Sequence, residues 1–268
     1  MPDSPFLSRQ ARFASVESTN DVVRGWLAEG TPEVCLAVAD EQTAGRGRSG
    51  RAWVAPPGAA LLLSLGFRPT WLHADATWRL PAIVSLAMAA AVEDVAGVGR
   101  ETVALKWPND LAIVDTSDGG GGAVRKLGGV LGETSGLGTA DPTAIVGIGV
   151  NVDWRDHPIP ADLVGSMTSL ADLADGRPVS PATLLTAFVD ELEPRVRRLR
   201  AGAFDAAEWQ RRQLTTDRVV EIEAADGERL VARGVGVDDQ SGALVVADGP
   251  AERRLFVGEI VRVRLAAV

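Results

Sequence analysis

Short apolar runs joined by turn-forming residues most constrain what this chain can fold into. Runs of strand length cover residues 34–39, 59–67, 102–107, 111–114, 126–133 and 144–152. Helical patterns cover residues 18–30, where Ser18 and Asp21 have the spacing of a capping box, and residues 79–97 and 181–213. Residues 1–17 carry no clear pattern. Because hairpins join several of the strands and few helices intervene, the order predicts an α+β fold: a mixed, largely antiparallel sheet with flanking helices.

The pattern changes at about residue 214. Four short apolar runs follow, at 219–222, 230–235, 243–246 and 260–264, with turn signals between them. This spacing predicts a small SH3-like β-barrel. We therefore expect two domains, a core over residues 1–213 that carries the candidate site and a C-terminal SH3-like domain over residues 214–268.

Composition excludes several classes of protein. With one cysteine and two histidines in 268 residues, neither a disulfide framework nor a Cys/His zinc cluster is expected, and no tight acidic cluster predicts a metal site. The net charge of −9 argues against general binding to nucleic acid or anionic membranes. No apolar run is long enough to span a membrane and no secretory signal opens the chain, so we expect a cytoplasmic protein.

The basic residues are almost all arginine. Of the 27 lysines and arginines, the two lysines are Lys106 and Lys126. Codon bias is the simplest reason for the scarcity, but it does not explain why the two lie so near each other in sequence. We expect that a position still held by lysine needs a compact ammonium on a flexible stem.

A polar loop over residues 40–53 joins two predicted strands. It reads Gln42-Thr43-Ala44-Gly45-Arg46-Gly47-Arg48, with Arg51 and Trp53 following. Its glycines allow close approach of the backbone to an anion, and its guanidinium groups can bind phosphate bidentately. It is not a P-loop, because Arg51-Ala52 stands where that motif requires Lys-Ser or Lys-Thr. A solvated arginine-rich loop has the same composition, so both interpretations stay open at this point.

Three further motifs lie on or at the ends of predicted strands. They are Lys106-Trp107-Pro108-Asn109-Asp110, Lys126-Leu127-Gly128-Gly129 and Gly149-Val150-Asn151. A lysine at a strand end beside a rigid turn is well placed to meet a ligand. Glycines within strands indicate close approach of a ligand or a neighbouring strand, or simply a bulge. No Ser-His-Asp or Cys-His set is visible, so no enzyme nucleophile is expected.

Taken together and in this order, the motifs resemble the biotin protein ligase family. The resemblance begins at Ser18-Thr19-Asn20, covers about residues 16–213, and fits the C-terminal barrel. It implies a core related to class II aminoacyl-tRNA synthetases and lipoate ligases. It also implies the reaction: biotin and ATP form biotinyl-5′-adenylate and pyrophosphate, and biotin then passes to a lysine of a biotin carboxyl carrier domain. ATP and biotin would be substrates, with Mg²⁺ carried by the nucleotide.

The resemblance assigns roles to individual residues. Biotin would be contacted by Ser18, Thr19, Asn20, Gln42, Arg46, Gly47, Arg48 and Lys106. The nucleotide would be contacted by Arg48, Arg51, Trp53, Asn109, Lys126 and Asn151. Lys106 and Arg48 would be catalytic: the ammonium lies between the biotin carboxylate and the α-phosphate, and the guanidinium stabilises the departing pyrophosphate.

Two features depart from the family's pattern. The hairpin over residues 115–125 is long and rich in glycine, and we expect its tip, Asp118 to Gly122, to be flexible. The N-terminus has no room for a DNA-binding domain, so we expect a ligase without repressor function, with no DNA partner, acting as a monomer or homodimer.

Two rival interpretations remain. One is a lipoate–protein ligase, against which Gln42 and the Gly-Arg-Gly-Arg loop favour biotin. The other is a non-enzymatic ligand sensor or RNA-binding module, against which the net charge counts in the case of RNA.

Overall fold

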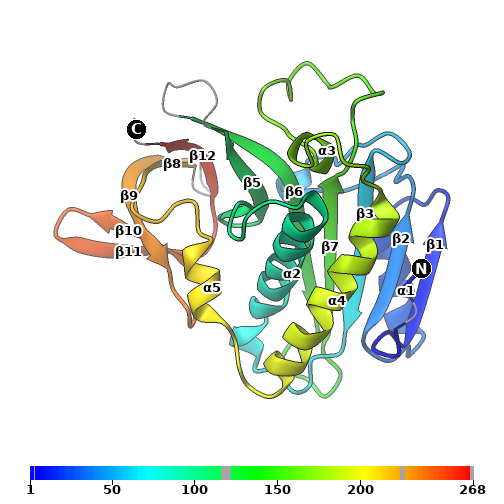
Figure 1. The fold of residues 1–268 in the computed structure, drawn as a ribbon. Helices are drawn as coiled ribbons and strands as arrows, with labels where there is room; N and C mark the ends of the chain where they lie inside the picture. The colour runs from blue at the N-terminus through cyan, green and yellow to red at the C-terminus, as the bar shows by residue number, and fades with distance from the viewer. Residues whose placement is uncertain (3, 116–121, 224–226, 266–268) are drawn as a thin grey trace.

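The structure is a computed structural model that describes all residues except 3, 116–121, 224–226 and 266–268. Its elements run in the order β1 (Arg9–Phe13), α1 (Thr19–Ala28), β2 (Cys35–Ala39), β3 (Ala60–Phe67), α2 (Arg79–Ala96), β4 (Ala104–Lys106), β5 (Asp110–Asp115), β6 (Ala123–Ser135), β7 (Thr143–Asn151), α3 (Leu170–Leu173), α4 (Pro181–Arg200), α5 (Ala206–Arg211), β8 (Val219–Glu223), β9 (Arg229–Val237), β10 (Leu244–Asp248), β11 (Ala251–Leu255) and β12 (Glu259–Arg264) (Figure 1). The sequence predicts that the tip of the 115–125 hairpin is flexible. This tip lies largely outside the described residues.

A seven-stranded sheet forms the larger part of the molecule. Its strand order is β1-β2-β3-β7-β6-β5-β4. The β1–β2 pair is parallel and the other neighbours are antiparallel. The predicted α+β fold with a mixed, largely antiparallel sheet is therefore confirmed.

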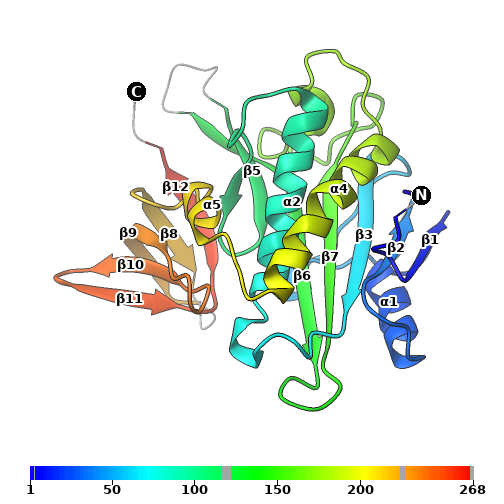
Figure 2. The same cartoon turned by 60° about the horizontal axis from the view of Figure 1, so that its bottom comes forward.

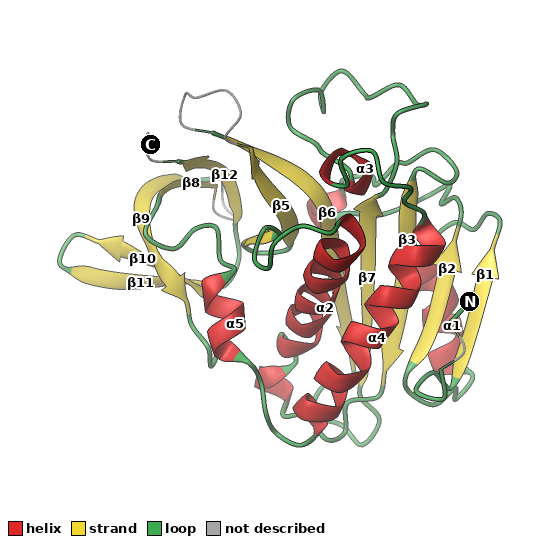
Figure 3. Ribbon diagram, viewed as in Figure 1, coloured by secondary structure: helices red, strands yellow, loops and turns green. Residues whose placement is uncertain are grey.

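Helices cover both faces of this sheet. Helices α2 and α4 pack on each other and on β3, β6 and β7, while α1 packs on β2, β3 and β7 (Figures 1 and 3). Alternation along β2 explains how it serves two layers, because Leu36 belongs to the main core and Cys35 to the cluster beneath α1. The many alanines of α2 are buried, which lets this helix lie between the sheet and α4.

The C-terminal strands form a second sheet in the order β11-β10-β9-β8-β12. Within the described residues this sheet is open, because β11 and β12 are its two edges and do not pair with each other. The predicted SH3-like barrel is therefore not confirmed. Figure 2 shows the second sheet beside the β4–β5–β6 end of the first one.

Several local predictions need correction. Helix α1 begins after Ser18 as expected, but the Ser18 side chain makes no capping hydrogen bond. The Asp21 carboxylate, which a capping box would turn toward the Ser18 N–H, binds Arg46 and Arg24. The predicted helix over 181–213 is two helices, separated near Gly202, which adopts a left-handed φ of +81°.

Two edge strands were not predicted. Strand β1 lies within the segment 1–17, and β11 is mostly exposed and charged. Neither sequence alternates strongly between apolar and polar residues, which is the signal that strand prediction uses.

Candidate functional site

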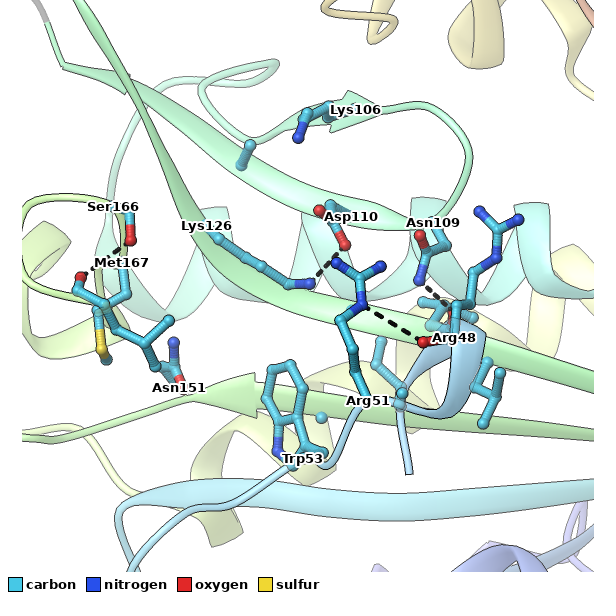
Figure 4. A pocket seen from close by; sticks show the side chains of 18 of the residues that line it. Arg48, Arg51, Trp53, Lys106, Asn109, Asp110, Lys126, Asn151, Ser166 and Met167 are labelled. Carbon is cyan, nitrogen blue, oxygen red and sulfur yellow. Dashed lines mark hydrogen bonds and ion pairs between the residues drawn. The ribbon is translucent and has the colours of Figure 1, made fainter. Parts of the chain in front are cut away.

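One large cavity, of about 1130 Å³, opens between the β5–β6–β7 part of the first sheet, the 40–53 loop and strand β12. Figure 4 shows side chains from the 40–53 loop and from β5, β6 and β7 converging on it. Every site residue expected from the sequence lines this cavity: Ser18, Thr19, Asn20, Gln42, Arg46, Gly47, Arg48, Arg51, Trp53, Lys106, Asn109, Lys126 and Asn151. The separate motifs thus meet in one place, although their individual roles remain predictions.

A chain of buried polar groups forms one wall of the cavity. Gln42 Oε1 accepts hydrogen bonds from the backbone nitrogen of Thr19 at 2.7 Å and from its hydroxyl at 3.0 Å. The Thr19 hydroxyl lies 2.6 Å from that of Ser64, which donates to Asn20 Oδ1 at 2.6 Å. Gly147 makes room for this arrangement, because a Cβ there would lie 2.4 Å from Asn20 Oδ1. The wall is neutral and hydrogen-bonded, which suits a polar uncharged ligand group.

The 40–53 loop folds back on itself. The backbone nitrogen of Trp53 donates to the oxygen of Gly45 at 2.9 Å, and that of Gly47 donates to the oxygen of Arg51 at 2.7 Å. A Cβ on Gly45 would lie 2.4 Å from the Trp53 oxygen, so glycine is required for this close approach. The turn between them passes through Gly50, whose φ of +73° favours glycine.

Arg46 fastens the first half of the loop to helix α1. Its guanidinium donates to both carboxylate oxygens of Asp21, at 2.8 and 2.7 Å. This bidentate pair is the main cause that lowers the pKa of Asp21 to about 2. Arg46 thus lines the cavity with its guanidinium paired to α1, and its predicted closure over biotin stays a prediction.

Arg48 and Arg51 fasten the second half of the loop to the C-terminal sheet. Arg51 Nη1 lies 2.6 Å from Glu259 Oε1, and Arg48 Nη1 donates to the backbone oxygen of Gly258 at 3.4 Å. Burial lowers the pKa of Arg48. An arginine side chain nevertheless stays protonated in proteins, so Arg48 is a cation. Two guanidinium groups thus border the cavity on one side.

The two lysines border the same cavity from β4 and β6, the strands on either side of β5 (Figure 4). Lys126 Nζ lies 2.6 Å from Asp110 Oδ1 and 5.6 Å from the centre of the Trp53 ring. Lys106 lies directly across from Asp110 in the β4–β5 ladder, yet within the described residues it forms no ion pair. Because burial is the main influence on it, the pKa of Lys106 is lowered from the usual lysine value. Of the two lysines, Lys106 would therefore be stabilised more by an anionic ligand.

A flat platform lies between the lysines and Asn151. Trp53 rests on Gly149, where a Cβ would lie only 2.5 Å from the ring. Asn151 Nδ2 donates to the oxygen of Thr168 at 3.1 Å, and this bond fixes the orientation of its carboxamide. Asn109, by contrast, holds the turn in place, because its Nδ2 donates to Val130. An aromatic face beside a fixed amide suits a planar heterocycle.

The sequence interpretation missed two parts of the lining. One is the 154–167 segment, which contributes Trp154, Leu163, Ser166 and Met167; the other is β12, which contributes Glu259, Arg262 and Arg264. The first follows directly from Asn151 along the chain and could have been suspected. The second depends on how the two sheets pack and leaves no local signal.

Two kinds of site are not found in the described part of the chain. Among those residues no group of three or more His, Cys, Asp or Glu side chains is placed to hold a metal ion. Similarly, no helix in the described ranges is long and apolar enough to cross a membrane.

Comparison with known proteins identifies the family to which this chain belongs. The sequence model described as Biotin/lipoate A/B protein ligase family matches residues 12–153, which include all the motifs lining the cavity from the first sheet. The chain belongs to this ligase family. The match spans strands β1 to β7 and so covers the core of the fold.

Relatives within the ligase family cover almost the whole chain. The chain is 31% identical to the biotin–[acetyl-CoA-carboxylase] ligase of Mycobacterium tuberculosis, over 94% of this chain and 88% of that one. The biotin protein ligase of Aquifex aeolicus, solved with biotin and ATP, has the same fold with a TM-score of 0.75, at 23% identity over 97% of this chain and all of that one. The Leishmania major enzyme, solved with biotinyl-5-AMP, is 26% identical over 92% of this chain and 98% of that one, with a TM-score of 0.55.

The geometry is suited to joining two anions. A neutral polar wall, a cationic middle formed by Arg48, Lys106 and Lys126, and an aromatic platform follow one another around a single cavity. Cations fixed in a partly desolvated site can hold a carboxylate and a phosphate together and stabilise the charge that moves between them.

Proposed function

We propose that this chain is an ATP-dependent biotin protein ligase. It activates biotin as biotinyl-5′-AMP and then transfers biotin to a lysine of a biotin carboxyl carrier domain. The observation that carries this proposal is the convergence of all four ligand motifs on one cavity, in a chain of the biotin/lipoate ligase family. The biotin ligase from M. tuberculosis named above supports biotin over lipoate as the acid.

In the first step the biotin carboxylate attacks the α-phosphorus of ATP. An oxygen–phosphorus bond forms, and the bond to the bridging oxygen of pyrophosphate breaks. Two anions must approach each other, and at about 4 Å their repulsion is roughly 1 kcal/mol in water and several-fold larger in a desolvated site. The unpaired ammonium of Lys106 would offset this repulsion, and Arg48 would stabilise the departing pyrophosphate. ATP enters as its magnesium complex, so the metal arrives with the substrate.

The polar wall suits the ureido ring of biotin. Buried N–H and C=O groups are costly if left unpaired, and Ser18, Thr19, Asn20 and Gln42 offer both donors and acceptors. At the opposite end, Trp53 and Asn151 suit adenine, and Lys126 and Arg51 suit the phosphates. Asn109 would act by holding the turn that follows Lys106.

In the second step the acceptor lysine attacks the acyl carbonyl of the adenylate. An amide forms, AMP leaves, and the amine loses a proton. The enzyme need supply no nucleophile, and much of the rate comes from holding the two reactants together. We infer a division into a catalytic unit, residues 1–213, and an SH3-like unit, residues 214–268, supported by the change of sheet at β8. β12 would let the second unit complete the nucleotide side of the cavity.

Biotin-dependent exchange of radiolabelled pyrophosphate into ATP tests the first step. We expect exchange with biotin and none with lipoate at the same concentration. Transfer of labelled biotin to a purified carrier domain, with a carrier whose target lysine is replaced by arginine as control, tests the second step. Exchange that depends on lipoate but not biotin would contradict the proposal.

A further inference from the structure

Glu133 lies on β6, outside the residues that line the cavity, yet it contacts two segments that do. Its Oε1 accepts a hydrogen bond from Asn20 Nδ2 at 2.9 Å and lies 3.9 Å from Arg46 Nη2. Its second oxygen is paired with Arg24. The side chain is 30% exposed, so the carboxylate is only partly solvated.

The charge of Glu133 determines how the Asn20 carboxamide is turned. A carboxylate only accepts hydrogen bonds, so the NH₂ end of Asn20 must face it. The oxygen of Asn20 then faces Ser64, whose hydroxyl donates to it. Asn20 is 4% exposed and Ser64 is fully buried, so water does not compete for these bonds.

The same sequence of donors and acceptors continues from Ser64 to Thr19 along the wall. Because Ser64 uses its one proton on Asn20, the single proton of the Thr19 hydroxyl is directed to the Ser64 hydroxyl at 2.6 Å and Gln42 Oε1 at 3.0 Å. The Thr19 proton is then used inside the wall, and the oxygens of Thr19 and Gln42 are left to accept. At these two residues the wall therefore offers hydrogen-bond acceptors, which are suited to ligand N–H groups.

We propose that Glu133 is a positioning residue that fixes the donor and acceptor sense of this wall, acting through Asn20 and Ser64. The inference rests on the proposed function, since the N–H groups that the wall would receive are those of the biotin ureido ring. Neither Glu133 nor Ser64 lines the cavity, so an effect of either on biotin must pass through a neighbour that does, and Asn20 is the lining residue that both contact.

The test compares Glu133→Gln, Ser64→Ala and the double variant in the full chain, with KM for biotin and for ATP measured by pyrophosphate exchange. We expect each single variant to raise the biotin KM roughly tenfold, the size of one hydrogen bond to a charged group, with little change in ATP KM. The double variant should be no worse than the more affected single variant, because both changes interrupt one relay.

Asp21→Asn is the matched control. The Asp21 carboxylate pairs with the same two arginines as Glu133 but not with the Asn20 carboxamide, so its effect on biotin KM should multiply with that of Ser64→Ala. The role of Glu133 is overturned if Glu133→Gln leaves the biotin KM unchanged, if biotin and ATP KM rise together with a lower melting temperature, or if its effect multiplies with that of Ser64→Ala. A wild-type chain without biotin-dependent exchange would overturn the proposed function as well.

Discussion

At the scale of single residues, the two lysines of the sequence have different surroundings in the cavity. Lys126 is paired with Asp110 and lies over Trp53, whereas Lys106 is, among the described residues, unpaired, and burial lowers its pKa. An unpaired, partly buried ammonium is costly in the empty protein and gains most when an anion binds. We therefore propose that Lys106, rather than Lys126, acts in the first step.

We expect Lys106→Ala to reduce biotin-dependent pyrophosphate exchange by about 10²–10³-fold at saturating substrates, the usual loss when one positioned donor to a developing charge is removed. Lys106→Arg tests the geometry with the charge kept. A Lys106→Ala variant with full activity and an unchanged melting temperature would refute the assignment while leaving the family membership intact.

The pH dependence of activity gives a second test of the role of Lys106. Burial lowers its pKa, so the free enzyme should lose the ammonium at a lower pH than an ordinary lysine would. The alkaline limb of kcat/KM for exchange should therefore lie below the ordinary lysine range and move upward in Lys106→Arg. An identical alkaline limb in both enzymes would show that another group titrates.

Gly149 offers a test of the aromatic platform. A methyl group there would lie 2.5 Å from the Trp53 ring, so Gly149→Ala should displace the ring and raise ATP KM several-fold, at a cost in stability of about 1–3 kcal/mol. Gly132→Ala on the neighbouring strand is the control, because its nearest contact would be an ordinary 3.7 Å. Equal behaviour of the two variants in ATP KM would remove Trp53 from the nucleotide site.

At the scale of elements, the 40–53 loop is held at both ends by different parts of the fold. Arg46 binds α1, and Arg51 binds β12. Both anchors are ion pairs at the protein surface, which contribute little stability individually. Breaking one of these ion pairs therefore costs little, so Arg51 can exchange Glu259 for a bound phosphate.

We expect biotin plus ATP to protect this loop from trypsin, which cleaves after Arg46, Arg48 and Arg51. Cleavage after Arg253 in the C-terminal sheet serves as the internal reference, because it lies away from the lining of the cavity. A loop cleaved at the same rate with and without both ligands would show that it does not close over them.

Elements also show which parts of the fold sequence can predict. The interior strands are apolar runs such as Leu61–Leu63, so their presence was predicted, as was the mixed sheet. Strands β1 and β11 were missed because edge strands can be polar, as Arg253 and Arg254 are. Ser18 marked the start of α1, but the predicted capping box did not form, and the Asp21 carboxylate pairs with Arg46, a residue 25 positions away.

At the scale of the whole molecule, the two sheets are joined close to Lys106. The backbone nitrogen of Leu105 donates to Arg212 at 2.7 Å, and that of Leu214 donates to Leu105 at 2.8 Å. Trp107 Nε1 donates to the backbone oxygen of Gly242, in the turn between β9 and β10 of the second sheet. The sequence motifs predicted a single site formed by residues of the first sheet. Glu259 reaches that site only because the two sheets pack together, and the sequence around Glu259 gives no sign of this.

Arg212 holds this joint through a buried ion pair. Its guanidinium lies 2.6 Å from Glu93 of α2, and both side chains are almost fully buried, at 2% and 1% exposure. Arg212→Met would leave Glu93 charged, buried and without its main partner, so we expect a loss of about 3–5 kcal/mol in urea denaturation. The double variant with Glu93→Leu should recover much of that loss, and a single variant as stable as wild type would refute the importance of the pair.

The placement of Lys106 has a consequence for the order of events during protein synthesis. Its strand is three residues long and is completed on one side by residues 212–214, and the arginine loop is completed by Glu259. These partners leave the ribosome long after residues 18–151 have done so. A growing chain therefore holds every first-sheet motif while its cavity still lacks a wall, and the complete site forms only when synthesis has reached the last strand.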